Sequence, residues 1–215
     1  MIICGSRKYK NINLDHLVDS FDWIVRHNML MQGCGYGQKL SNRQIINSHI
    51  NRNIDRGYVL GNWNNDYGKE YNTSPEVIEK FYNFTQENSD RIHYYVSNNP
   101  SALFNILPNK HRATYNLMPR VGMAYLAEAI DKGDKPFLIG YSISEDTLLS
   151  HAVCTKEKLN TICHNPHKEI EIIKYLHNEG KLDATFCCIE DKAELTLNDT
   201  IEHTEEALEI LRRTL

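Results

Sequence analysis

The feature of this chain that most constrains its fold is an alternation between short apolar runs and longer amphipathic segments. The apolar runs are rich in Ile, Val, Phe and Tyr and lie near turn-forming residues, which is typical of buried strands. The amphipathic segments repeat their apolar residues at helical spacing, and several begin with a proline in the first turn. We expect strands over 1–4, 22–25, 91–96, 135–140 and 184–189, and helices over 14–20, 75–88, 119–132, 166–178 and 199–213.

Strands that alternate with helices predict a mostly parallel sheet with helices on both faces. The fold class is therefore α/β, and 215 residues suit a single Rossmann-like domain over 1–215. In such sheets, ligands bind at the carboxyl ends of the strands, near the point where the strand order reverses. Residues that directly follow predicted strands are thus the first candidates for a site. The stretch 33–69 is polar and weakly periodic, so we expect a long excursion there.

The composition disfavours several partners and chemistries. The chain is 41% hydrophobic and 24% charged, with a formal charge of -4 and no dense Lys/Arg stripe, which disfavours nucleic acid as a partner. The first residues have neither the basic start of a signal peptide nor the long apolar run of a transmembrane segment. The six cysteines show no CxxC spacing and do not cluster with the ten histidines, so we expect reduced thiols and no metal site.

A first block of residues around the opening strand suits a nucleotide or sugar. Gly5 lets the backbone turn tightly and approach a ligand, and Ser6 with the turn amides suits a phosphate or a ribose. Asn28 follows the next predicted strand and offers both a donor and an acceptor. The turn lacks the GxGxxG pattern and the P-loop lysine, which argues against ordinary dinucleotide and P-loop NTPase sites.

A later block, His164 to Glu169, joins a loop to a strongly periodic helix. Asn165 is a good N-cap and Pro166 fits the first turn, so we expect His164 just outside the helix N-terminus. The positive end of the helix dipole disfavours an imidazolium there and keeps the ring neutral. A neutral histidine in this position suits a general base, whereas the simpler interpretation is a surface loop with a helix cap.

These blocks, together with one that starts near Arg120, resemble in their order and spacing the motifs of sialyltransferases, including the bacterial enzymes with His-x-x-x-x-Asp. The resemblance covers most of the chain. The large sialyl motif is matched by Cys4–Ser6, Asp22–Asn28 and 35–43, the small motif by Met118–Ile130 with 137–142, and the very short His-x-x-x-x-Glu motif by His164–Glu169.

The resemblance implies a sialyltransferase variant of the GT-A-like fold that transfers sialic acid, or a related acidic sugar such as Kdo, from a CMP-sugar to a glycan or glycolipid hydroxyl, with inversion. His164 would be the general base, and Glu169 would stabilise the first helical turn or orient the loop. We expect no cofactor and no obligatory metal, a cytoplasmic location that is at most peripheral to a membrane, and an oligomeric state that the sequence leaves open. The expected donor-binding residues are Gly5, Ser6, Asn28, Arg120, Gly122, Gly140, Tyr141 and Ser142.

The chain departs from the family pattern at the donor site. Ser6 stands where the family usually has Asn, and Arg120-Val121 stands where Ser or Thr residues approach the donor. The stretch between Gly140 and His164 shows no clear counterpart of the family's tyrosine-rich motif. These departures predict altered donor specificity, and they keep two alternatives open: a nucleotide-binding or nucleotide-sensing Rossmann-like protein, and an inactive relic that still binds CMP.

Overall fold

A five-stranded parallel sheet organises the part of the chain that the computed structural model describes, which comprises residues 1–5, 14–28, 30–33, 36–47, 75–95, 101–112, 119–141, 165–184 and 187. Its strand order is β4-β3-β2-β1-β5, and each pair of neighbours is parallel. The strands are β1 (Ile2–Cys4), β2 (Ile24–His27), β3 (Arg43–Asn47), β4 (Ile92–Tyr95) and β5 (Phe137–Ile139).

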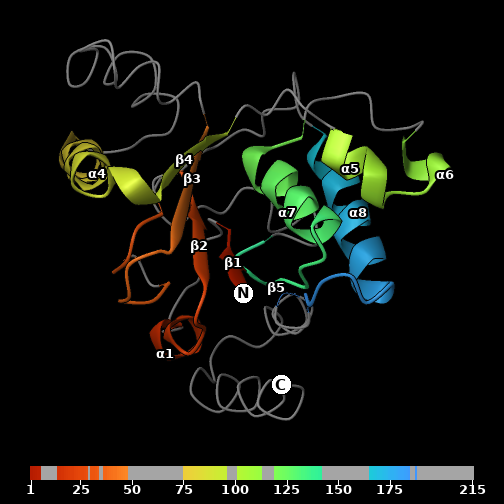
Figure 1. Ribbon diagram of the computed structural model, residues 1–215, viewed down its shortest axis with the longest axis horizontal. Helices are drawn as coiled ribbons and strands as arrows, with labels where there is room; N and C mark the ends of the chain where they lie inside the picture. Colours follow the sequence, from red (N-terminus) through yellow and green to blue (C-terminus); the bar gives the residue numbers. More distant parts are fainter. Residues whose placement is uncertain are drawn as a thin grey trace.

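Helices cover both faces of this sheet. Figure 1 shows α5, α7 and α8 on one side of the strands and α1 and α4 on the other. This arrangement confirms the predicted α/β class, while the extent of a single domain over 1–215 stays a prediction. The helices are α1 (Asp15–Asp19), α4 (Pro75–Glu87), α5 (Ser101–Ile106), α6 (Asn109–Arg112), α7 (Val121–Asp131) and α8 (Pro166–Asn178), with a 3-10 turn η2 (Ser89–Arg91) before β4.

The alternation of side chains along each strand explains why both faces need helices. Ile3 and its strand neighbours Val25 and Leu138 pack into one apolar cluster with α5, α7 and α8. Ile2 and Cys4 point the other way and pack with α1. Because side chains alternate with a period of two, the next residue beyond Cys4 faces α7 again.

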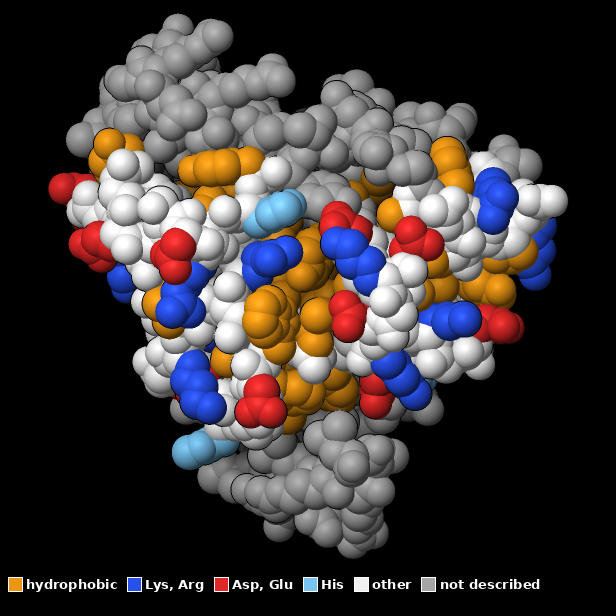
Figure 2. Space-filling model, in the orientation of Figure 1, with side chains coloured by type: hydrophobic (Ala, Val, Ile, Leu, Met, Phe, Trp, Pro, Cys, Tyr) orange, Lys and Arg blue, Asp and Glu red, His pale blue; other side chains and the backbone are white. Residues whose placement is uncertain are grey.

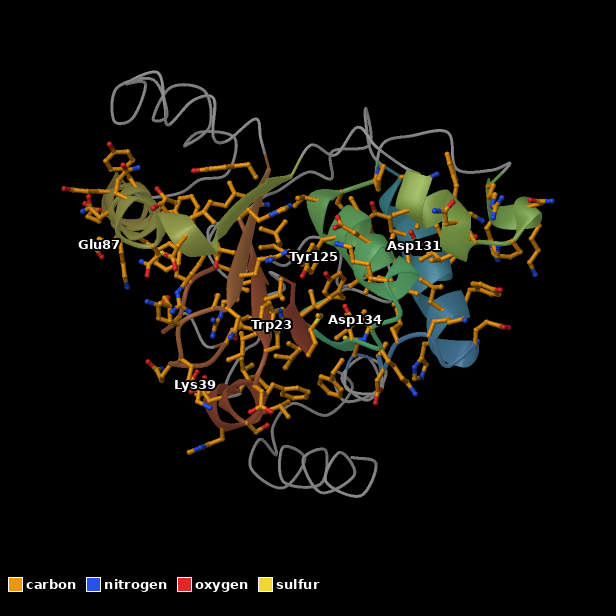
Figure 3. All side chains as sticks on the ribbon, in the orientation of Figure 1. Trp23, Lys39, Glu87, Tyr125, Asp131 and Asp134 are labelled. Atoms are coloured by element: carbon orange, nitrogen blue, oxygen red, sulfur yellow. The ribbon has the colours of Figure 1, made fainter. Side chains whose placement is uncertain are left out.

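Tyr125 illustrates the packing of α7 on the sheet. Its side chain is buried and lies between the helix and the strands in Figure 3. The largest exposed apolar side chain beside this layer is Trp23, which directly precedes β2 and is 40% exposed. It lies near the middle of the face in Figure 2, where apolar side chains gather between charged ones. Trp23 is thus at the amino end of β2, whereas the predicted ligand-binding edge is at the carboxyl ends of the strands.

One predicted strand and one predicted excursion differ from the structure in the residues that it describes. Of the predicted strand over 184–189, Ala184 is outside any strand and Cys187 is helical, whereas residues 185, 186, 188 and 189 lie outside the described residues. Asp183 forms a single parallel bridge with Phe137, and the Ala184 N–H donates to His177 Nδ1 (3.2 Å) instead of to a neighbouring strand. The predicted excursion over 33–69 contains β3, and the sequence patterns also missed α5 and α6. The predicted helix over 199–213 lies outside the described residues.

The remaining helical predictions are confirmed to within a few residues. α8 has the predicted bounds, and Gly133 and Gly180 follow α7 and α8 with positive φ angles of 93° and 67°. Glycines commonly end helices in this conformation, because a residue without a Cβ adopts a positive φ without a steric clash. None of the helices within the ranges given above is long and apolar enough to cross a membrane.

Candidate functional site

The carboxyl ends of β1, β2 and β5 form a common edge. Cys4 pairs with Arg26 on one side and with Ile139 on the other, so the next row consists of Gly5, His27 and Gly140. β1 lies between β2 and β5. From β1, the chain adds β2, β3 and β4 on one side of the sheet and later adds β5 on the other side. This is a strand-order reversal of the kind at which α/β proteins bind ligands.

Gly5 and Gly140 let two backbones meet at this reversal. The Gly5 N–H donates to the Ile139 carbonyl oxygen (2.7 Å). A Cβ on Gly5 would lie 2.3 Å from the Gly140 oxygen, and one on Gly140 would lie 2.5 Å from the Gly5 oxygen. Gly140 also has a φ of 72°, which glycine tolerates best. The close approach that the sequence predicts for Gly5 is therefore made, within the described residues, to the chain's own backbone.

Tyr141 and His27 fill the space that these glycines leave under α7. Tyr141 Cδ2 lies 3.0 Å from the position of a Gly5 Cβ. The two rings meet edge to face, with centroids 5.9 Å apart and planes at 86°. A Cβ on Gly122 would lie 3.2 Å from both His27 Cε1 and the Tyr141 hydroxyl oxygen, so a glycine there lets the first turn of α7 approach the rings.

Burial keeps both of these rings uncharged. Desolvation lowers the pKa of His27 from 6.5 to about 4. It also raises the pKa of Tyr141 well above 10.0, with the nearby Cys4 as a smaller cause. His27 Nε2 is buried and has no hydrogen-bond partner in the part of the chain that the structure describes. The sequence places His27 in the stretch after the second predicted strand, where a ligand is expected, but within that stretch only Asn28 was assigned a donor contact.

Asn28 directly follows β2 and therefore lies next to this row. It adopts a φ of 48°, its N–H donates to the Ile45 oxygen (2.7 Å), and its own oxygen accepts from Gln44 Nε2 (2.7 Å). These bonds hold its backbone between β2 and β3. The side chain of Asn28 is half-buried. Part of it is therefore accessible to a ligand at the strand ends.

Arg120 and Glu169 connect the start of α7 with the first turns of α8. Arg120 is the N-cap residue of α7 and has an extended backbone, so its N–H is available to donate to Glu169 Oε1 (2.7 Å). Its Nε also donates to Glu169 Oε2 in an ion pair. The Glu169 side chain is fully buried and that of Arg120 is 40% exposed. Glu169, for which the sequence predicted a supporting role, therefore contacts a predicted donor-binding residue.

The start of α8 has the predicted cap. Asn165 Oδ1 accepts from the Lys168 N–H (3.0 Å), and Pro166 occupies the first turn. His164 immediately precedes this cap in sequence but lies outside the described residues, as do the predicted site residues Ser6 and Ser142. The structure brings Gly5 and Gly122 against Tyr141, which directly follows Gly140. Asn28 directly follows β2, and Arg120 directly precedes α7.

The described residues hold no group of three or more His, Cys, Asp and Glu side chains that could bind a metal ion. Independence from a metal and from a cofactor stays a prediction.

No family model and no curated protein matches this sequence. Two similar solved structures are of the sialyltransferase CstII from Campylobacter jejuni in complex with a substrate analogue. The structure with cytidine-5'-monophosphate is 20% identical at a TM-score of 0.44 and covers 84% of this chain and 77% of that chain. The structure with CMP-3FNeuAc is 17% identical at a TM-score of 0.42 and covers 84% and 80%.

Proposed function

We propose that this protein is a glycosyltransferase that moves sialic acid, or a related acidic sugar such as Kdo, from a CMP-sugar to a glycan or glycolipid hydroxyl. The observation that carries the proposal is the contact between Arg120 and Glu169. It joins the blocks that resemble the small and the very short sialyl motifs, close to the strand-order reversal that bears the first block. A connection between these blocks near a strand-order reversal, where α/β sheets commonly bind ligands, supports a common site.

The donor would lie across the ends of β1, β2 and β5. Asn28 offers a donor and an acceptor to the cytidine or the ribose, and Ser6 and the backbone around Gly140 to Ser142 would add further polar contacts. Arg120 pairs through its Nε with Glu169, and because its side chain is 40% exposed, the rest of its guanidinium would be able to meet an anionic oxygen of the donor. Since Arg120 replaces the small hydroxyl residue of the family, we expect the preference among acidic sugars to differ from the usual one.

His164 would act as the general base. It would take the proton from the acceptor hydroxyl while that oxygen forms a bond to the anomeric carbon of the donor sugar. The bond from the anomeric carbon to the phosphate oxygen breaks on the opposite side, and CMP leaves with the electron pair, so the configuration inverts. Glu169 would be a positioning residue, since its carboxylate holds α8, which begins two residues after His164, against the start of α7.

The test of this mechanism is His164→Ala. We expect sugar transfer to fall by about 10²-fold or more, because a general base contributes roughly 10²–10⁴-fold, while CMP affinity stays nearly unchanged. The matched control is His167→Ala, because His167 is an exposed residue in the first turn of α8. Full transfer activity in His164→Ala would exclude the assigned base.

A thermal-shift series with CMP, CDP, UDP, AMP and NAD tests the class of protein. Selective stabilisation by CMP supports the transferase, since a ligand that binds only the folded state raises its stability. Stabilisation by adenine nucleotides alone would indicate a nucleotide sensor instead. CMP binding without transfer or hydrolysis of CMP-sialic acid and CMP-Kdo would indicate an inactive relic.

A further inference from the structure

We infer that His27 is an anion-binding residue of the donor site, whose Nε2 hydrogen-bonds an anionic oxygen of the bound CMP-sugar at the first turn of α7. This inference rests on the proposed function and adds to it a residue to which the sequence patterns assigned no contact.

The first support is the unpartnered nitrogen itself. His27 is only 5% exposed, and its Nε2 is buried without a hydrogen-bond partner among the described residues. Buried polar atoms are paired in the great majority of cases, because an unpaired one retains its full desolvation cost. An apolar side chain of similar size would avoid that cost. A bound ligand that supplies the missing partner explains why a histidine occupies this position.

The second support is the position of the ring. His27 stands in one row with Gly5 and Gly140, so it contributes the only side chain of that row across β5, β1 and β2. Its Cε1 lies 3.2 Å, and its Nδ1 3.3 Å, from the position of a Gly122 Cβ. The ring edge formed by Cε1 and Nδ1 therefore faces the first turn of α7, and Nε2 is the next ring atom beyond Cε1.

The third support is the electrostatic character of that turn. α7 has 11 residues, and the amides of its first turn lack acceptors within the helix. The Glu169 carboxylate already accepts from the Arg120 N–H just before this turn, so the ligand anion would meet the amides that follow Arg120. A neutral imidazole can donate through Nε2–H without a buried charge, and the edge-to-face contact with Tyr141 holds its ring. A CMP-sugar of the proposed kind carries two anionic groups, the phosphate and the sugar carboxylate, and both offer the same oxyanion chemistry.

The experiment compares wild type, His27→Leu and His27→Gln by calorimetric titration with cytidine, CMP and a non-transferable CMP-sialic acid analogue. We expect His27→Leu to weaken anion-dependent binding about tenfold or more, as for loss of a hydrogen bond to a charged group. His27→Gln retains an N–H donor and should recover part of the affinity. The control is His93→Leu on β4, at the edge of the sheet opposite β5.

The three ligands separate the two anionic groups. A penalty with CMP but not with cytidine assigns Nε2 to the phosphate, and a penalty only with the sugar analogue assigns it to the carboxylate. An equal penalty with all three ligands, or none with any, overturns the inference while CMP binding by wild type still supports the proposed function. If wild type binds no cytidine nucleotide, the proposed function fails and this inference fails with it.

Thermal unfolding distinguishes a functional histidine from a structural one. Removal of an unpartnered buried polar group should leave the melting temperature of His27→Leu equal to that of wild type or higher. A clear drop in melting temperature with unchanged affinity would assign His27 a structural role only. Should the variant fail to fold, the 15N resonance of Nε2 in wild type provides the readout. It must shift on addition of CMP or the analogue, and an unchanged resonance with both overturns the inference.

Discussion

Two neighbouring buried residues of β2 differ in whether their polar side-chain atoms have hydrogen-bond partners. Arg26 is fully buried, and its guanidinium donates to the backbone oxygens of Tyr36 and Lys39 and to the Ser41 hydroxyl. It thereby fixes residues 36–41 against the strand. His27 points to the opposite face and leaves Nε2 without a partner within the described ranges. Arg26 therefore serves the fold, whereas the unpartnered Nε2 of His27 is the atom that the proposed anion contact would use.

Burial of His27 makes the stability of the protein depend on pH. Its pKa is about 4 in the folded chain against 6.5 for an ordinary histidine, so between these values the unfolded chain binds a proton that the folded chain does not. Above pH 6.5 the ring is neutral in both states and the full stability is present. The free energy of unfolding then decreases as the pH falls from 6.5 towards 4. The whole difference amounts to about 3 kcal/mol.

Urea unfolding at pH 7.5 and pH 4.5 measures this effect. Wild type should lose roughly 2–3 kcal/mol more than His27→Leu over this interval, because the variant lacks the titrating group. Equal losses in both proteins would show that His27 does not titrate as its burial implies.

At the scale of elements, the junction of β1 and β5 depends on close backbone packing. In Gly140→Ala, the new Cβ would lie 2.5 Å from the Gly5 backbone oxygen at a φ of 72°. We expect a loss of about 3 kcal/mol or more, since the contacting atom belongs to a backbone that cannot move aside. The control Gly133→Ala has a φ of 93° but no atom within 4 Å, so about 1 kcal/mol is expected. Equal losses in denaturant unfolding would contradict this account of the junction.

Elements with local signals were predictable from sequence, and those stabilised by distant partners were not. α8 carries its cap, its proline and its apolar period within its own residues, and its bounds were predicted. β3 was missed because only Ile45 and Ile46 give it an apolar signal. Its buried Gln44 is acceptable only because its amide donates to the oxygens of Asn28 and Leu30 (2.7 and 2.8 Å). No local pattern reveals such bonds.

The same distinction holds for the candidate site. Gly5, Asn28 and Gly140 could be selected because each follows a strand, and the sheet brings those strand ends together. The contact of Arg120 with Glu169 could not be predicted, since it joins residues 49 positions apart. The close approach of His27 to Gly122 likewise depends on how α7 lies on the sheet, which the sequence pattern does not specify.

At the scale of the whole molecule, the pair of Arg120 and Glu169 connects helices that start from distant parts of the chain. Its partners differ in burial, since Glu169 is fully buried and the Arg120 side chain is 40% exposed. Removal of the arginine would take an ion pair from a fully buried carboxylate, whereas removal of the carboxylate would leave a guanidinium that can turn towards water. The two substitutions should therefore have unequal effects.

We expect Arg120→Gln to lower the free energy of unfolding by roughly 3 kcal/mol and Glu169→Gln by roughly 1–2 kcal/mol, as measured in urea. The control is Glu128→Gln, which breaks the pair with Lys132 on the surface of α7, where about 0.5 kcal/mol or less is expected. Glu169→Gln should also lower sugar transfer, because the start of α8 would then be less firmly held against α7, and small displacements of a catalytic group cost rate. If neither substitution exceeds the control in unfolding, the pair does not connect the two helices energetically, and Glu169 loses its assigned positioning role.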